Sequence, residues 1–168
     1  MKYAIMLSVI MALLLSGCKY ESPLTKEHHI SVDAAVFGLW ELIPDEGEEE
    51  KQNKRMMILK YSDTEYLIHY PIGKNGLYFR GYAIVIGGVS CVQLQVIGAD
   101  DGPPKEGEKD LFHVVAYQVM DGKLEVKILN SDLIDDNLKV AETLEAFLHY
   151  RDHKELFTDP GSFRRIDG

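Results

Sequence analysis

The sequence is poor in residues that usually carry covalent chemistry or cross-links. Its 168 residues include only two cysteines, Cys18 and Cys91, and one tryptophan, Trp40. It has no glycine-rich phosphate loop, and Ser90 follows a Gly-Gly turn instead of standing in a strand-to-helix nucleophile elbow. The net charge of −9 argues against nucleic acid as a partner, because the two would repel each other. We therefore expect no enzyme activity, no catalytic residue and no cofactor.

The sequence also lacks an apolar run long enough to cross a bilayer. Lys2 is followed by an apolar stretch of 12 residues, Ala4–Leu15, and then by the small residues Ser16 and Gly17. A bilayer span needs about 20 apolar residues. The three-part pattern is typical of a secretory signal over residues 1–17, whose removal with Lys2 would change the net charge from −9 to −10.

Leu15-Ser16-Gly17-Cys18 resembles the lipobox of bacterial lipoproteins. The resemblance implies that Cys18 becomes the N-terminus and carries acyl chains such as palmitate. Several chains together hold a protein on a bilayer almost permanently. In the enterobacterial proteins that it resembles, Lys19 in place of Asp favours the outer membrane of the cell envelope. The alternatives are an uncleaved signal anchor, or an ordinary signal with an unmodified cysteine.

Residues 18–33 are polar, include Pro23 and show no sustained period, so we expect a tether there. Residues 34–168 are then expected to form one domain. If Cys18 is acylated, Cys91 has no disulfide partner, and the domain depends on its hydrophobic core. Cys91 lies in an apolar strand pattern and is expected to be buried.

From residue 34 onward, short alternating apolar runs separated by turn residues predict β-strands. Gly87-Gly88 and Asp121-Gly122 are typical of two-residue hairpin turns. Helical spacing of apolar residues predicts one helix at about 136–151. The expected strands cover residues 36–42, 55–61, 65–70, 77–86, 89–97, 111–120, 123–129 and 162–166.

This order predicts a mainly β fold. About eight antiparallel strands form a meander, which hides its edges by closing into a small up-and-down barrel, with the helix near the C-terminus. An open sheet packed on the helix is the alternative.

Gly38-Leu39-Trp40 on the first expected strand resembles the Gly-x-Trp signature of lipocalins and the wider calycin barrels. The resemblance implies that Gly38 relieves crowding where the strand bends and that Trp40 closes the barrel floor. It also implies that a basic residue of the last strand, Arg164 or Arg165, packs across Trp40; alternation lets only one of them face inward. The expected helix precedes the last strand, whereas in lipocalins the long helix follows it.

Aromatic residues on the middle strands are the candidates for binding. They predict non-covalent binding of an apolar or amphipathic small ligand inside the barrel, with ordinary strand packing as the alternative. A protein-interaction module, an inhibitor or envelope assembly accessory using its outer surface or the acidic residues at 45–50, is the second hypothesis. The candidate ligand-binding residues are Tyr66, Tyr70, Tyr78, Tyr82 and Tyr117.

The histidines are weaker candidates, in this case for binding a metal ion. Glu145, His149 and His153 share one face of the expected helix, where zinc could bind, but we interpret this spacing as an exposed polar helix face. His28 and His29 lie in the expected tether, which offers no preorganised geometry. We therefore predict no metal site.

Overall fold

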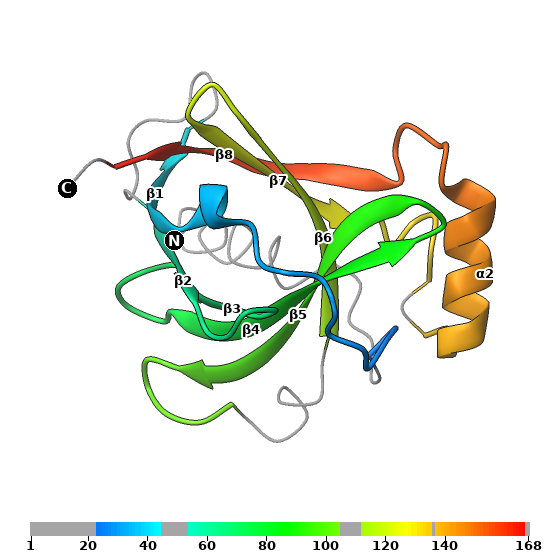
Figure 1. Cartoon of the computed structure of the whole chain (residues 1–168), viewed down its shortest axis with the longest axis horizontal. Helices are drawn as coiled ribbons and strands as arrows, with labels where there is room; N and C mark the ends of the chain where they lie inside the picture. The colour runs from blue at the N-terminus through cyan, green and yellow to red at the C-terminus, as the bar shows by residue number, and fades with distance from the viewer. Residues whose placement is uncertain (1–22, 45–53, 105–111, 136, 167–168) are drawn as a thin grey trace, which may run out of the picture.

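The computed structural model describes residues 23–44, 54–104, 112–135 and 137–166. Its eight antiparallel strands follow one another in sequence order around a closed barrel (Figure 1). The elements in chain order are the 3-10 helix η1 (Ala34–Val36), β1 (Gly38–Ile43), β2 (Arg55–Lys60), β3 (Tyr66–Tyr70), β4 (Leu77–Ile86), β5 (Val89–Ala99), β6 (Phe112–Met120), β7 (Lys123–Leu129), α2 (Val140–Tyr150) and β8 (Phe157–Arg165).

The predicted barrel is confirmed, and the open sheet is excluded. β1 pairs with β8, with Trp40 opposite Arg165, so the sheet has no free edge among these strands. The hairpin turns Gly87-Gly88 and Asp121-Gly122 have positive φ at both central residues, as such turns require.

The last strand is longer than its sequence indicates. β8 begins at Phe157, not at residue 162, because Thr158 already pairs with Ile128. Gly161 pairs with Val126, so β8 holds one more residue than β7 across this stretch, as in a β-bulge. Pro160, which would stop a regular strand, falls within this irregularity.

Alternation along the strands divides the apolar residues between the two faces of the barrel wall. The interior core lies inside the barrel and consists of Val36, Trp40, Met56, Ile58, Tyr66, Tyr70, Val92, Val115, Leu124, Ile128 and Phe163. The outer core covers one side of the wall and consists of Leu24, Tyr82, Ile84, Ile86, Cys91, Val114, Leu129, Ile134, Phe147 and Leu156.

α2 packs outside the barrel, beside the tip of the β4–β5 hairpin (Figure 1). It begins at Val140, four residues later than expected, and Lys139 just before it has an extended backbone conformation. Glu142 accepts the Lys139 N–H at 3.0 Å and so satisfies one donor at the helix start. Phe147 is fully buried and joins the helix to the outer core. Within the described ranges, no helix has the length and apolar character needed to span a bilayer.

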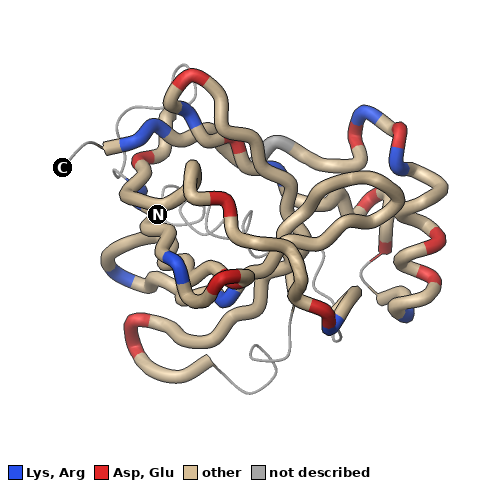
Figure 2. Tube along the Cα trace, in the orientation of Figure 1, with Lys and Arg blue, Asp and Glu red and all other residues tan. Residues whose placement is uncertain are grey.

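Residues 23–33, which we call the strap, lie on the barrel although the sequence predicts a tether there. Figure 1 shows the strap crossing the barrel toward η1. Leu24 is 7% exposed and belongs to the outer core, and the Val32 N–H donates to the Asp63 carbonyl at 3.0 Å. Charged residues are spread along the described trace rather than gathered in one patch (Figure 2).

Candidate functional site

The barrel encloses an apolar cavity of about 120 Å³. Its walls come from η1 and from seven of the eight strands, β2 to β8. Polar groups are few: the histidine ring and three tyrosine hydroxyls. The lining residues are Val36, Met56, Ile58, Tyr66, Ile68, Tyr70, Phe79, Val92, Leu94, His113, Val115, Tyr117, Leu124, Val126, Ile128 and Phe163.

Three of the five candidate tyrosines, Tyr66, Tyr70 and Tyr117, line this cavity. Burial raises the pKa of Tyr70 to about 12. Burial, and then a hydrogen bond with Tyr66, also raise the pKa of Tyr117. These hydroxyls are therefore neutral at physiological pH, and the cavity presents neutral polar groups to an occupant.

The other two candidates lie on the outer face, because β4 turns Phe79 inward and its neighbours outward. The Tyr78 ring stacks on the His69 ring with centroids 4.1 Å apart, and His69 Nε2 lies 3.1 Å from an Asp100 carboxylate oxygen. Tyr82 belongs to the outer core. Neither tyrosine contributes to the cavity wall.

η1 closes one end of the cavity. Val36 lines the cavity, and its carbonyl accepts a hydrogen bond from Trp40 Nε1 at 2.8 Å. Asp33, just before η1, donates its N–H to the Tyr66 hydroxyl at 2.7 Å and accepts a bond from the Tyr117 hydroxyl at 3.4 Å. Two cavity-lining tyrosines are thus tied to the segment that covers them.

Arg165, not Arg164, lies over Trp40. Its guanidinium carbon is 4.8 Å from the ring centroid, and it donates to the Ala35 carbonyl at 2.5 Å. Gly38 has φ of +130°, a conformation that residues with a Cβ rarely adopt. Trp40 and Arg165 thus pack together where β1 pairs with β8.

Arg164 faces outward and donates to the Glu41 carboxylate at 2.5 and 3.0 Å. Arg55 lies 3.5 Å from the same carboxylate. The hydrogen bond from Arg164 is the main reason that the pKa of Glu41 is lowered. This ion-pair cluster joins β1, β2 and β8 across the seam of the barrel.

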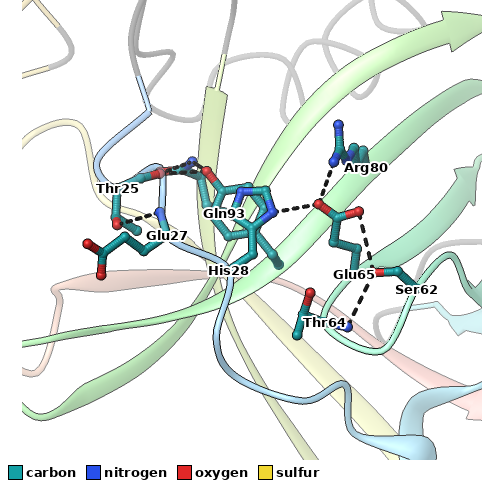
Figure 3. Close-up of polar contacts among 9 residues, drawn as sticks. Thr25, Glu27, His28, Ser62, Thr64, Glu65, Arg80 and Gln93 are labelled. Atoms are coloured by element: carbon teal, nitrogen blue, oxygen red, sulfur yellow. Dashed lines mark hydrogen bonds and ion pairs between the residues drawn. The ribbon is translucent and has the colours of Figure 1, made fainter.

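A polar network fastens the strap to the wall (Figure 3). His28 stacks on Tyr82 with ring centroids 3.6 Å apart, and its Nδ1 lies 2.5 Å from a Glu65 oxygen. Arg80 donates to the same oxygen at 2.5 Å. Burial disfavours the charged form of Glu65, but the bonds from Arg80 and His28 outweigh it and lower its pKa.

Backbone groups of the strap are satisfied by side chains of β4 and β5. The Leu24 N–H donates to Gln93 Oε1 at 2.7 Å, and the Tyr82 hydroxyl donates to the Thr25 carbonyl at 2.6 Å. Gln93 is fully buried and also donates to the Tyr82 hydroxyl. Sequence reasoning missed this role of His28 and Gln93, because their partners in these contacts, Glu65 and Leu24, lie 37 and 69 positions away along the chain, and nothing local marks such contacts.

The remaining candidates show no reactive arrangement in the described part of the chain. Cys91 is buried, and burial raises the pKa of its thiol to about 12, so the thiolate is scarce at neutral pH. His149 packs edge-on against Tyr150. No group of three or more histidine, cysteine, aspartate or glutamate side chains among these residues could hold a metal ion. Cys18 and the acidic residues at 45–50 lie outside the described residues.

Comparison of the chain with protein-family models, with curated proteins and with solved structures gives no match.

Proposed function

We propose that this protein is a lipid-anchored protein of the bacterial envelope that binds a small apolar or amphipathic molecule inside its barrel. The observation that carries the proposal is the cavity of about 120 Å³ with its almost entirely apolar lining. Empty apolar cavities of about 150 Å³ stay dry and take up benzene. An apolar occupant would recover contacts that the lining side chains lack.

The size of the cavity restricts the ligand. Pockets for drug-sized molecules measure about 300–1,000 Å³, so this cavity suits a molecule near the size of benzene or one end of a longer chain. Tyr70 and His113 are two of the four polar residues in the mostly apolar wall; the other two, Tyr66 and Tyr117, are bonded to Asp33. We therefore expect apolar contact to supply most of the affinity and Tyr70 and His113 to orient an amphipathic ligand.

The cavity can be tested with toluene as the probe. Val126→Phe places a ring in the cavity, since Val126 lines it. Val85→Phe is the matched control, because Val85 is 56% exposed. We expect calorimetric titration to detect saturable toluene binding by the wild type and by Val85→Phe, and none by Val126→Phe. Absence of binding by the wild type, or equal binding by all three proteins, would contradict a functional cavity.

The anchor can be tested separately by metabolic labelling with an alkyne analogue of palmitate. The lipobox resemblance predicts a label on the wild type and none on Cys18→Ser. Cys91→Ser is the control, because it removes the other cysteine and should keep the label. Labelling that survives in Cys18→Ser, or is absent from the wild type, refutes acylation of Cys18 and leaves the cavity experiment unaffected.

A further inference from the structure

A second hollow, of about 260 Å³, lies on the outside of the barrel wall between the strap and strands β4, β5 and β6. We call it the outer pocket. Arg80, Tyr82 and Gln95 line it, and they alternate along their strands with Phe79 and Leu94, which line the cavity. The wall therefore separates the outer pocket from the barrel interior, so the two spaces can bind different ligands.

The outer pocket is basic in a protein that is acidic as a whole. Lys26, His28 and Arg80 line it, and no described acidic residue does. Glu65 contacts His28 and Arg80 at 2.5 Å each, so the carboxylate offsets one positive charge and leaves Lys26 as the excess. A local excess of positive charge attracts anions even where the net charge of the chain is −9.

The basic groups are held in place before any ligand arrives. Glu65 fixes one end of the Arg80 guanidinium, whose carbon also lies 5.5 Å from the centroid of the Tyr61 ring. His28 is held by its stacking on Tyr82. Arg80 and His28 side chains remain 39% and 26% exposed, so a ligand can reach them. Groups ordered beforehand lose less entropy on binding.

Apolar surface completes the outer pocket. Pro23, Tyr82 and Phe112 line it together with the basic side chains. An inorganic anion would leave these rings without a contact, whereas an anion on an apolar body would cover them. The pocket therefore favours an amphipathic ligand with a negatively charged head.

We propose that the outer pocket binds the anionic group, a phosphate ester or carboxylate, of a molecule with a small apolar or aromatic body. Such a group could belong to a free organic anion or to a lipid headgroup. The lipid source rests on the proposed anchor: Pro23 is five positions after Cys18, and five residues span at most about 17 Å. A barrel tied to a membrane at that distance holds its outer pocket close to the headgroups.

The test uses the full chain as the bacterium processes it, purified in a non-ionic detergent, and phenyl phosphate as the probe. Lys26→Gln removes an exposed charge, and Lys123→Gln, an exposed lysine on β7, is the matched control. We expect saturable binding by the wild type, unchanged in Lys123→Gln and weakened about threefold to tenfold in Lys26→Gln, the range for losing one charged contact. Phenol, which lacks the charge, should not compete with phenyl phosphate for the outer pocket.

Two results would overturn the proposal: no binding of phenyl phosphate by the wild type, or equal weakening in the two lysine variants. The cavity variant Val126→Phe should bind phenyl phosphate normally, so failure of the cavity and failure of the outer pocket are distinguishable. Vesicles identify the source. Competition by phosphatidylglycerol but not by phosphatidylcholine vesicles supports a headgroup, and binding without vesicle competition supports a free anion.

Discussion

The interior core and the outer core lie on opposite faces of one wall, and they are built differently. The interior core comes from the strands and η1 and still encloses about 120 Å³ of free space. The outer core is completed by segments outside the sheet, which supply Leu24 from the strap and Ile134, Phe147 and Leu156 from the α2 region.

This difference assigns stabilisation to the outer core and the cavity to the interior core. The outer face uses added segments to bury apolar surface, and Val114, Ile134 and Phe147 there are fully buried. The interior keeps a void at the cost of contacts that its lining could otherwise make. We infer that the outer core contributes stability that compensates for a hollow interior.

The largest effect is expected from removing the ring that joins α2 to the wall. Phe147→Ala should lower the free energy of unfolding by about 3–5 kcal/mol, because it deletes a buried ring and leaves a cavity. Leu148→Ala on the same helix is the control; its side chain is 46% exposed, and the change should be far smaller. Denaturant titration measures both. A Phe147→Ala protein as stable as Leu148→Ala would show that the outer core contributes little.

The same substitution on the two faces of the wall compares them directly. Val114→Phe should destabilise by about 1–3 kcal/mol, since Val114 is fully buried in the outer core and an added ring overpacks it. Val126→Phe should be neutral or stabilising by about 0.5–2 kcal/mol, because its ring has the cavity to occupy. Thermal unfolding of both variants checks the contrast. Equal destabilisation would mean that the cavity cannot accept a ring.

Acid should loosen the strap through Glu65. The pKa of this carboxyl is lowered from 4.5, so its stabilising effect is present above about pH 4.5 and is lost as the pH falls through the lower, folded-state value. Once Glu65 is neutral, it no longer offsets the positive charge of Arg80, and its ionised contact with His28 of the strap is lost. Amide exchange at Leu24 should therefore accelerate below that pH.

Glu65→Gln is the comparison for this acid effect. At pH 7 its strap should exchange faster than that of the wild type, and the difference between the two proteins should shrink as the pH falls. Exchange at Val92, on a strand of the interior core, serves as the internal reference. An acid response that is the same in both proteins would assign it to other carboxyl groups.

The smallest change in the free energy of unfolding is expected at the barrel floor. Arg165→Gln should lower the free energy of unfolding by about 0.5–1 kcal/mol, the usual size of a cation–π contact at an exposed site. Arg164→Gln tests the neighbouring position, where the contact is an ion pair with Glu41. Trp40 fluorescence should change in Arg165→Gln and stay constant in Arg164→Gln. The opposite pattern would contradict the assignment of Arg165 to the floor.

The sequence predicts the wall of this barrel well, because strand alternation and tight turns are local properties. β4 and β7 have the predicted bounds, and the turns at Gly87-Gly88 and Asp121-Gly122 take the expected conformation. The first half of β8 could not be predicted, because Pro160 lies within it and proline normally ends a strand. The bulge that accommodates this residue is defined only by the pairing with β7.

The sites are less predictable than the wall. Alternation assigns Tyr66 and Tyr70 to one face, but it does not say which face of β4 points inward, so Tyr78 and Tyr82 enter the candidate set although both lie outside. The docking of the strap on the barrel could not be predicted from the sequence, because Leu24 contacts Gln93 and other residues far along the chain. Such contacts are tertiary and have no local signature.

The pairing of β1 with β8 also determines when this barrel can form. Glu41 and Arg164 are 123 positions apart, so the ring closes between the first and the last strand of the chain. Contacts of such long range are entropically costly and slow to form. A chain that emerges N-terminus first from a ribosome or a translocation channel cannot complete its barrel until β8 has left. Until that moment β1 has only one of its two neighbours, and the unfolded chain keeps the flexibility that passage through a narrow channel requires.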